Sequence, residues 1–493
     1  RNLSPSDHFG HDLERSVFIR IDFEPNKDGI AYICFNESFS KGEARFASNE
    51  DVPLESASFL SNDVRNRCAL VYIEADRDLY KHLGASSWRL FGRIIEQFER
   101  SFPVEHRQPL EQTFDNALDF LRTNEFIEFE NTLAQSFEEQ IRQTGHKLQI
   151  DFKAFDPRSY YKSLNLLLRR QDTETLQLEE AGQGMQSLVL LALFRAYASV
   201  FKDNAIVAIE EPEIYLHPHA QRSLFNLFNE LAAKGSQVFY TTHSSHFVSP
   251  EHFDNICLVR REGNGTSLGA TTVTQVAGER MLTARQQLHP SINMSIQGIK
   301  RRYFNLSSLE HSEAFFAKKV IIVEGDTETS ALPIYARFLN YDFDANGISV
   351  VGTGGKKAVD WFYHLYSLFG IPTYVVFDND SDQLSPEWND VLLRMLGEEE
   401  ETVPEPLVGS AYAVLNQNFE NEMRLDIGEA VYDQYKQEAG DILGKCRKGL
   451  LSRYMAVRLV SVGQVPKFVC DVIGQVRDLG VAEAADIAGY EES

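Results

Sequence analysis

Two adjacent glutamates end an apolar run near the middle of the chain. The stretch A-I-V-A-I-E-E-P-E at 205–213 has the pattern of a buried strand that delivers Glu210 and Glu211 to its carboxyl end. Burying an unpaired carboxylate at that position costs free energy unless a metal ion or a bound water interacts with it. In a nucleotide hydrolase the first carboxylate orients the water shell of Mg²⁺ and the second polarises the attacking water. We therefore expect Glu210 in the first role and Glu211 in the second.

Two further segments carry groups that suit a phosphate. E-E-A-G-Q-G-M-Q-S at 179–187 opens an apolar helix, and glycines and a serine at a helix start present backbone N–H groups to an anion. The candidates in this loop are Gly182, Gly184 and Ser187. A second apolar strand, Q-V-F-Y-T-T-H, ends at His243, a residue type that can contact a γ-phosphate. Both segments extend the predicted nucleotide site.

A second group of acids follows apolar strands later in the chain. V-I-I-V-E-G-D-T-E at 320–328 predicts a buried strand ending in Glu324, with Gly325 permitting a sharp turn into a helix. I-P-T-Y-V-V-F-D-N-D predicts another strand, whose alternation points Asp378 and Asp380 to one side. If these strands are parallel neighbours, three carboxylates converge. Such an all-oxygen cluster suits two Mg²⁺ or Mn²⁺ ions and phosphodiester cleavage.

These acids need elements that position them, and the chain supplies strands alternating with helices twice over. That order indicates two α/β domains in series. The stretch between the two parts of the first domain, at 86–145, has apolar residues at helical spacing and is rich in Glu, Gln and Leu. This pattern predicts long helices that project from the first domain. We expect the first domain at 1–85 and 146–265, a helical insertion at 86–145, a connector at 266–317, and a second domain with a C-terminal helical region at 318–493.

Composition sets limits on partners and compartment. The 493 residues are 43% hydrophobic, which is typical of a globular protein, and no apolar run is long enough for a membrane span. The formal charge of −24 repels nucleic acid at long range, so a nucleic-acid partner must be held by local basic patches. The five cysteines form no C-x-x-C pair, which argues against zinc and disulfides and for a reducing cytoplasm.

The order and spacing of the first group of motifs resemble the ABC-type ATPase core. The resemblance maps the signature loop to Gly182–Ser187, the Walker B strand to Ala205–Glu211, the switch histidine to His243 and the D-loop region to Leu216–Pro218. It implies ATP as a cofactor and a site shared between two protomers. No G-x-x-x-x-G-K-[ST] motif is present, and we interpret the chain as beginning inside a domain, after the phosphate loop. Tag removal or processing is the alternative explanation of the start at Arg1, and a domain that binds no nucleotide is the alternative to an ATPase.

The second group, E-G followed by D-x-D, resembles the Toprim domain of topoisomerases, primases and some nucleases. V-V-G-T-G-G-K at 350–356 fits the intermediate Toprim strand and its glycine turn. An ABC-type ATPase domain with a helical insertion, followed by a Toprim (Rossmann-like) nuclease domain, resembles the OLD (overcoming lysogenization defect) family. The resemblance implies a metal-dependent DNA endonuclease, regulated by the ATPase domain and acting in anti-phage defence. It also implies a homodimer or higher oligomer, alone or with a helicase or a retron reverse transcriptase.

The OLD resemblance further assigns roles to individual residues. Metal ligands, direct or through water, would be Glu324, Glu328, Asp378 and Asp380, with Asp382 as a weaker candidate. Glu420 is an additional acid, or an ordinary glutamate on a helix face. The late lysine of the family, which neutralises phosphate charge in the transition state, maps to Lys467.

Basic residues near the second domain are candidates for DNA contacts. Tyr303 and Tyr454 are candidates for stacking on bases. Solvated helix faces that balance nearby acids are the alternative. The phosphate-contact candidates are Lys300, Arg301, Arg302, Arg447, Lys448 and Arg453.

Two other functions compete with the nuclease. Strand passage or priming keeps the Toprim chemistry, but the chain leaves no room for the additional domain with a nucleophilic tyrosine and has no zinc module. An SMC-like DNA-clamping ATPase or sensor without cleavage leaves the Toprim acids unexplained and prefers a longer coiled coil than 105–142. The sequence leaves open DNA against RNA, nicking against double-strand cleavage, and hydrolysis against simple binding of ATP.

Overall fold

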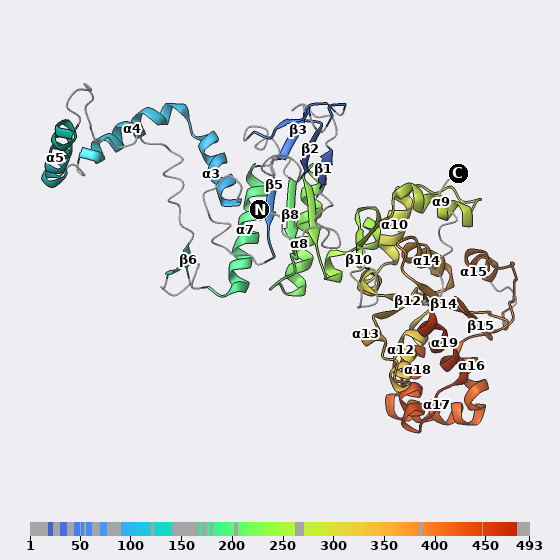
Figure 1. Cartoon of the computed structure of the whole chain (residues 1–493). Helices are drawn as coiled ribbons and strands as arrows, with labels where there is room; N and C mark the ends of the chain where they lie inside the picture. The colour runs from blue at the N-terminus through green and yellow to red at the C-terminus, as the bar shows by residue number, and fades with distance from the viewer. Residues whose placement is uncertain are drawn as a thin grey trace. The chain divides into compact units, whose positions relative to one another are not determined.

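The computed structural model divides the chain into two compact units, Arg1–Thr242 and His243–Ser493 (Figure 1). The residues that the structure describes are 18–22, 30–36, 44–49, 51–53, 56–61, 70–75, 90–119, 123–140, 167–169, 175–177, 181–201, 206–261, 271–383, 388–445 and 447–480.

The first unit contains an antiparallel sheet in the order β1-β2-β3-β4. Its strands are β1 (Phe18–Asp22), β2 (Tyr32–Asn36), β3 (Ala44–Ala47) and β4 (Ser58–Phe59). Tyr32 and Cys34 on β2 are buried with Ala47 of β3. The alternation of buried positions along β2 gives this sheet its small apolar core.

A three-stranded parallel sheet carries the first group of acids. Its order is β5-β8-β9, with β5 (Leu70–Ile73), β8 (Ile206–Glu210) and β9 (Gln237–Thr241), so that β8 is central. Helix α8 (Pro218–Ala233) packs an apolar stripe against the sheet, and the Phe228 ring stacks on that of Tyr240 at 5.3 Å. Because β8 is central and parallel, its last residue lies at the carboxyl edge, where α/β proteins bind ligands.

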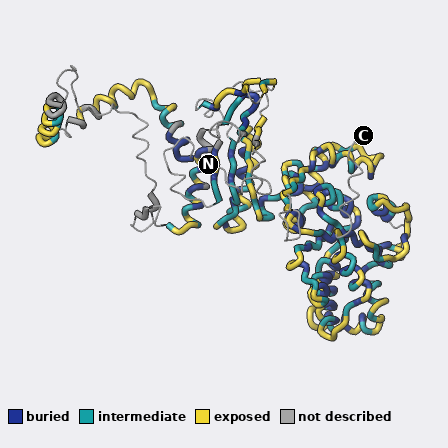
Figure 2. Tube along the Cα trace, viewed as in Figure 1, coloured by how far each residue is buried: buried dark blue, intermediate teal, exposed yellow. Residues whose placement is uncertain are grey.

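In the stretch expected to be a helical insertion, the described residues form three helices. These are α3 (Leu90–Ser101), α4 (Val104–Asp119) and α5 (Asn124–Gln140). The first packs on α7 (Gln183–Phe201), whereas Figure 2 shows α4 and α5 largely exposed. A small antiparallel pair, β6 (Leu167–Arg169) and β7 (Thr175–Gln177), completes the described elements of this unit.

The second unit is built on a five-stranded sheet in the order β13-β12-β14-β16-β15. All pairs are parallel except β15 with β16. The strands are β12 (Lys319–Val323), β13 (Ile348–Gly352), β14 (Thr373–Asp378), β15 (Leu407–Val408) and β16 (Tyr412–Leu415). The alternation of strands and helices predicted for this part of the chain is confirmed.

Helices cover both faces of this sheet. Ile321 and Val323 of β12 enter one apolar core, and Val320 and Ile322 enter the other, as the period of a strand requires. The first face is covered by α12 (Asp326–Phe338), α16 (Phe419–Ile427), α17 (Glu429–Leu443), α18 (Lys448–Ser461) and α19 (Lys467–Asp478). The second is covered by α9 (Gly278–Leu288), α10 (Ile296–Leu306), α14 (Val359–Leu368) and α15 (Asn389–Leu396) (Figure 1).

The segment expected to be a connector is part of this second core. Met281 on α9 and Ile299 on α10 are buried against the sheet, together with Val276. Shorter elements of the unit are β10 (Cys257–Arg261) paired with β11 (Thr271–Gln275), α11 (Leu309–Glu313), α13 (Phe343–Asn346), and the 3-10 turns Ser245–Phe247, Pro250–Asn255, Ala314–Phe316 and Lys356–Ala358. Among the described helices, none is both long and apolar enough to cross a bilayer.

Candidate functional site

The acids of the second unit meet at the carboxyl edge of the five-stranded sheet. Strands β12 and β14 are parallel neighbours, so Glu324, directly after β12, lies beside Asp378, the last residue of β14. The Asp378 N–H donates a hydrogen bond to Glu324 Oε1 at 2.9 Å. The convergence expected for these two residues is observed. Gly325 has extended backbone (φ −160°), so any residue could adopt its conformation and the expected need for glycine is wrong.

Asp380 reaches the site by a turn and not by strand alternation. Strand β14 ends at Asp378, and Asp380 has a positive φ of 49°, so the predicted two-residue alternation does not apply. The turn is held by Asn379, which is 2% exposed. Its side chain donates to Pro404 O at 3.0 Å and accepts from the Gln417 N–H at 2.7 Å. A buried amide therefore sets where Asp380 points.

Lys356 stands among these acids, and no role was expected for it. Its ammonium group donates to Asp378 O at 2.5 Å, to Asn389 Oδ1 at 3.0 Å and to Asp380 Oδ2. Glu324 Oε1 lies 3.7 Å away. Gly354 and Gly355, with φ of 73° and 134°, let the chain turn back after β13, and the Gly355 N–H donates to Glu324 O at 2.7 Å. A Gly-Gly-Lys after a strand was the signal that could have pointed to this lysine.

Glu328 lies in the first turn of α12 and is 5% exposed. Burial, together with the charges of Glu324 and Glu420, raises the pKa of Glu328 to about 8. Burial and the charges of Glu324 and Glu328 likewise raise the pKa of Asp378 to about 9, and burial raises that of Glu324. The site therefore holds more carboxylates than its neighbouring cations neutralise.

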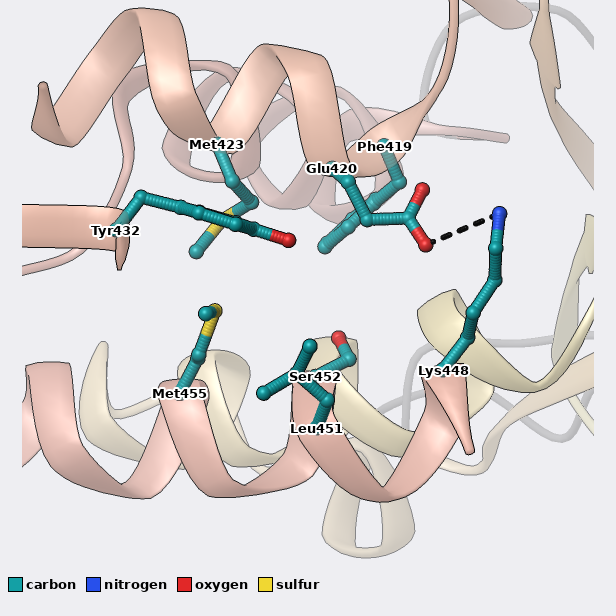
Figure 3. A pocket seen from close by; sticks show the side chains of 8 residues that line it. All are labelled: Phe419, Glu420, Met423, Tyr432, Lys448, Leu451, Ser452 and Met455. Atoms are coloured by element: carbon teal, nitrogen blue, oxygen red, sulfur yellow. Dashed lines mark ion pairs between the residues drawn. The ribbon is translucent and has the colours of Figure 1, made fainter. Parts of the chain in front are cut away.

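Lys448 brings a second ammonium group to the acids. Its Nζ lies 3.3 Å from Glu420 Oε1, and Figure 3 shows the two side chains facing each other across a narrow pocket between α16 and α18. Glu420 raises the pKa of Lys448, with smaller contributions from Asp378 and Glu328. Helix α18 can approach the start of α12, and so bring Lys448 near these acids, because Gly449 has no side chain and packs directly on Asp326. Lys448 thus belongs to the acidic site as well as to the basic residues expected to contact DNA.

Two further expected site residues are exposed, and one of them, Lys467, lies away from the acids. Lys467 is exposed at the start of α19, where the next residue, Phe468, donates its N–H to Asp426 Oδ2 at 2.9 Å. Asp426 is near the end of α16, whereas Glu420 is near its beginning, about 9 Å away along the axis. Lys467 is therefore placed at the opposite end of α16 from the acids. Asp382 is exposed in the turn after β14.

In the first unit, Glu210 is held by the end of β5. The Tyr72 hydroxyl donates to Glu210 Oε1, and the Ala75 N–H donates to Oε2 at 3.1 Å. Glu211 follows with a positive φ of 41°, and its N–H donates to Thr241 O at 2.9 Å.

The glycine loop before α7 contacts the segment after β8. Gly182 precedes α7 and Gly184 lies in its first turn, while the Tyr215 hydroxyl donates to Gln183 Oε1 at 2.6 Å. Ser187 is 1% exposed and lies one turn into the helix. His243 is exposed and follows β9, as the first residue of the second unit.

The basic residues divide between the two faces of the second unit's sheet. Lys300 on α10 pairs with Asp254 at 2.6 Å, and the exposed Arg301 and Arg302 lie on the same helix. Arg447 and Arg453 are exposed, before and on α18.

The two tyrosines expected to stack on bases lie in different environments. Tyr303 is wholly buried and donates to Trp361 O at 2.8 Å, so the hypothesis that it stacks on a base is wrong. Its spacing of four residues from the buried Ile299 is the signal of a core position. Tyr454 is half-buried, with its hydroxyl 3.5 Å from Glu438 Oε2.

The chemistry of the second unit's site suits a hard divalent cation. The candidate donors are carboxylate oxygens, which Mg²⁺ and Mn²⁺ prefer, and their raised pKa values show charge that a cation would relieve. Within the described ranges, no three His, Cys, Asp or Glu side chains are already arranged to enclose an ion. Asp380 and Glu324 instead face Lys356. The residues fit a metal in their chemistry, and binding requires their side chains to close around it.

Comparison with known proteins matches both parts of the chain. Residues 22–248 match the family described as AAA ATPase domain, and residues 315–380 match the overcoming lysogenization defect protein-like TOPRIM domain. The chain is 28% identical over 397 residues to an OLD nuclease of Thermus scotoductus, covering 76% of this chain and 71% of that protein. It is 24% identical over 318 residues to the Old nuclease of Escherichia phage P2 (61% and 52%), and 23% identical over 319 residues to endonuclease GajA of Bacillus cereus (60% and 44%). The chain therefore spans about half the length of the latter two.

Proposed function

This chain carries an AAA ATPase domain followed by an OLD-like Toprim domain, as its motifs predicted, and on that premise we propose that it is a metal-dependent DNA endonuclease regulated by its ATPase domain. The observation that carries the proposal is the convergence of Glu324 and Asp378 on one sheet edge, with Glu328 buried beside them. The similarity to three nucleases supports the reaction class. A role in anti-phage defence extends the proposal and rests on the OLD resemblance.

The carboxylates would hold one or two Mg²⁺ or Mn²⁺ ions. Bound there, the metal would supply an activated water and stabilise the leaving oxygen of the phosphodiester. The chain's own part is to hold the ligands at the sheet edge. The residues we assign to this task are Glu324, Glu328, Asp378, Asp380 and Glu420, with Asp382 as an outer candidate.

Lys448 is our candidate for contact with the reacting phosphate. It lies against Glu420, and its charge also acts on Asp378 and Glu328. A cation aimed at developing phosphate charge stabilises the transition state. We assign this role to Lys448 in preference to Lys467, which lies at the other end of α16. Arg447 and Arg453, on the same helix region, would continue the contact along the DNA backbone.

ATP binding in the first unit would regulate the nuclease. Glu210, held by Tyr72 and Ala75, would orient the Mg²⁺ water shell, and Glu211 would polarise the attacking water. Gly182 and Gly184 at the start of α7 would meet a phosphate. Because ABC-type sites form between protomers, we expect a homodimer or higher oligomer to be the active form.

Incubation with supercoiled plasmid tests the proposal. The purified chain is assayed with Mg²⁺, Mn²⁺ or EDTA, with and without ATP, beside Glu324→Gln and Asp378→Asn. Asp344→Asn is the matched control, because Asp344 is an exposed carboxylate of the same unit. We expect nicked or linear DNA only with metal, lost in both site variants and kept in the control. Cleavage that persists in EDTA, or in both site variants, would refute the assignment, and DNA binding without cleavage under any condition would favour a DNA-clamping ATPase.

A further inference from the structure

The Lys356 ammonium group uses all of its hydrogen-bonding capacity inside the acidic site. A lysine has three N–H donors. Those of Lys356 go to Asp380 Oδ2, Asp378 O and Asn389 Oδ1, and its side chain is 8% exposed. Two of the three acceptors are neutral groups. Simple charge neutralisation would not require these, so the contacts shape the backbone turn that follows β14 as well as pairing a carboxylate.

Asn389 closes a ring of contacts around that turn. It is the first residue of α15 and is 1% exposed. Its amide donates to Asn379 O at 2.8 Å and to Thr402 O at 2.9 Å, while its oxygen accepts from Lys356. Lys356 and Asn389 therefore hold the turn at three successive positions, through Asp378 O, Asn379 O and the Asp380 side chain.

A buried charge network fixes the two elements that carry this ring. Asp360, in the first turn of α14 and four residues after Lys356, accepts from Arg285 at 2.8 Å and lies 2.7 Å from His289 Nε2. The His289 ring in turn packs on that of Trp388, directly before Asn389, at 5.2 Å. Arg285 and His289 lie in the last turn and at the C-cap of α9. The C-terminal end of α9 therefore contacts both Asp360 of α14, which follows Lys356, and Trp388, which precedes Asn389.

We propose that Lys356 and Asn389 are positioning residues of the metal centre, which hold the Asp378–Asp380 turn in the shape that binds the ion. The inference rests on the proposed function, in which these aspartates are metal ligands. Neither residue is itself a ligand or a contact of DNA. Groups of this kind, which orient ligands from behind, typically change metal affinity by about 10- to 100-fold when they are replaced.

The opposite role for Lys356 makes a different prediction. If its ammonium group only competed with the metal for the carboxylates, removing it would tighten metal binding. If the Lys356 ammonium group positions the turn, removing it lets the neighbouring carboxylates, which carry like charges, move apart. Metal binding then becomes weaker. The contacts to Asp378 O and Asn389 favour positioning.

Mn²⁺ binding to the full chain distinguishes these roles without any cleavage assay. Calorimetric titration of Lys356→Met is compared with Lys357→Met, the exposed neighbour of the same type, and with the wild type. We expect the Kd for Mn²⁺ to rise about tenfold or more in Lys356→Met. It should stay within about twofold of the wild type in Lys357→Met. Unchanged or tighter binding by a folded Lys356→Met chain overturns the proposal.

A second variant keeps the test decisive if Lys356→Met does not fold. Asn389→Asp retains an oxygen for Lys356 but loses the N–H groups that hold Asn379 O and Thr402 O. An added negative charge alone would tighten Mn²⁺ binding, whereas loss of the turn weakens it, and we expect weakening. A wild-type chain that binds no Mn²⁺ refutes the metal centre itself and this inference with it. A wild-type chain that binds Mn²⁺ but cleaves no DNA refutes the nuclease alone.

Discussion

A Cβ atom added to Gly449 would lie 2.8 Å from the Cβ of Asp326 and 2.9 Å from its carbonyl oxygen. Helix α18 therefore approaches the start of α12 more closely than any side chain would permit. Ser452 Oγ strengthens the contact by donating to Thr327 O at 3.1 Å. Because Lys448 precedes Gly449 and Glu328 lies two residues after Asp326, this one approach brings the lysine to the buried acid.

Replacing Gly449 should lower the stability of the protein and move Lys448 away from the acidic site. We expect Gly449→Ala to lower the free energy of unfolding by about 1–3 kcal/mol, because the backbone of α12 must shift to admit a methyl group. Urea denaturation measures the loss. Gly440→Ala on α17 is the control, since a Cβ there meets nothing within 4 Å and alanine favours a helix. Equal effects of the two substitutions would contradict the close approach as the cause.

Lys448 and Lys467 make opposite predictions for DNA cleavage. We expect Lys448→Met to reduce the cleavage rate by about 10²- to 10³-fold, because it removes the exposed cation that lies against Glu420 beside the acids. Lys467→Met should stay near the wild-type rate, because Lys467 lies at the far end of α16. The measurement is the initial rate of plasmid cleavage at saturating metal. A strong loss in Lys467→Met with none in Lys448→Met would reverse our assignment.

The metal-free chain should lose stability as the pH rises. Folding raises the pKa of Glu328 to about 8 and that of Asp378 to about 9. A carboxyl group of this kind contributes stability that is complete below its unfolded pKa of about 4 and is lost as the pH rises through its folded pKa. We expect the free energy of unfolding in EDTA to fall between pH 5 and about 9, with a smaller slope in Glu328→Gln. A slope of the opposite sign that Glu328→Gln leaves unchanged would contradict the buried acid.

Metal binding should respond to pH in the opposite direction. The carboxyl groups must lose their protons to bind an ion, so binding releases protons and tightens with rising pH. We expect the Kd for Mn²⁺ to fall steadily up to about pH 9, as Glu328 and then Asp378 lose their protons. The same calorimetric titrations in buffers of different ionisation enthalpy count the protons released. A Kd independent of pH would exclude these acids as ligands.

The buried pair of Arg285 and Asp360 should matter far more than a surface pair. Both side chains are about 1% exposed or less, so Asp360→Asn leaves the Arg285 charge buried without its partner. We expect a loss of about 3–5 kcal/mol in the free energy of unfolding. Arg337→Gln, which removes a surface pair with Asp342 where the arginine is 69% exposed, should change stability little. Thermal unfolding of both variants checks the contrast.

Nucleotide turnover should depend on Glu211. We expect Glu211→Gln to reduce ATP hydrolysis by about 10²-fold or more while ATP still binds, because the amide cannot take a proton from water. Glu230→Gln is the control, an exposed glutamate on α8. Phosphate release and nucleotide binding are measured separately. Undiminished hydrolysis in Glu211→Gln would remove Glu211 from the proposed role.

Much of this molecule was readable from local sequence pattern. An apolar run that ends in an acid marks both a buried strand and its carboxyl end, because burial and alternation act over a few neighbouring residues. Glu210, Glu324 and Asp378 were predicted on that basis, and each lies at the end of a parallel strand. The order of an ATPase domain before a Toprim domain follows from the same motifs.

Only the tertiary structure decided which distant side chains complete the site. Lys356 reaches Asn389 across 33 residues, and Lys448 on α18 meets Glu420 on α16. Tyr303 turned out to be a core residue, although its basic neighbours suggested a surface. Spacing along the chain shows which residues share a strand or a helix face. It does not show which faces pack together, because that depends on the apolar area that all the helices bury at once on both sides of the sheet.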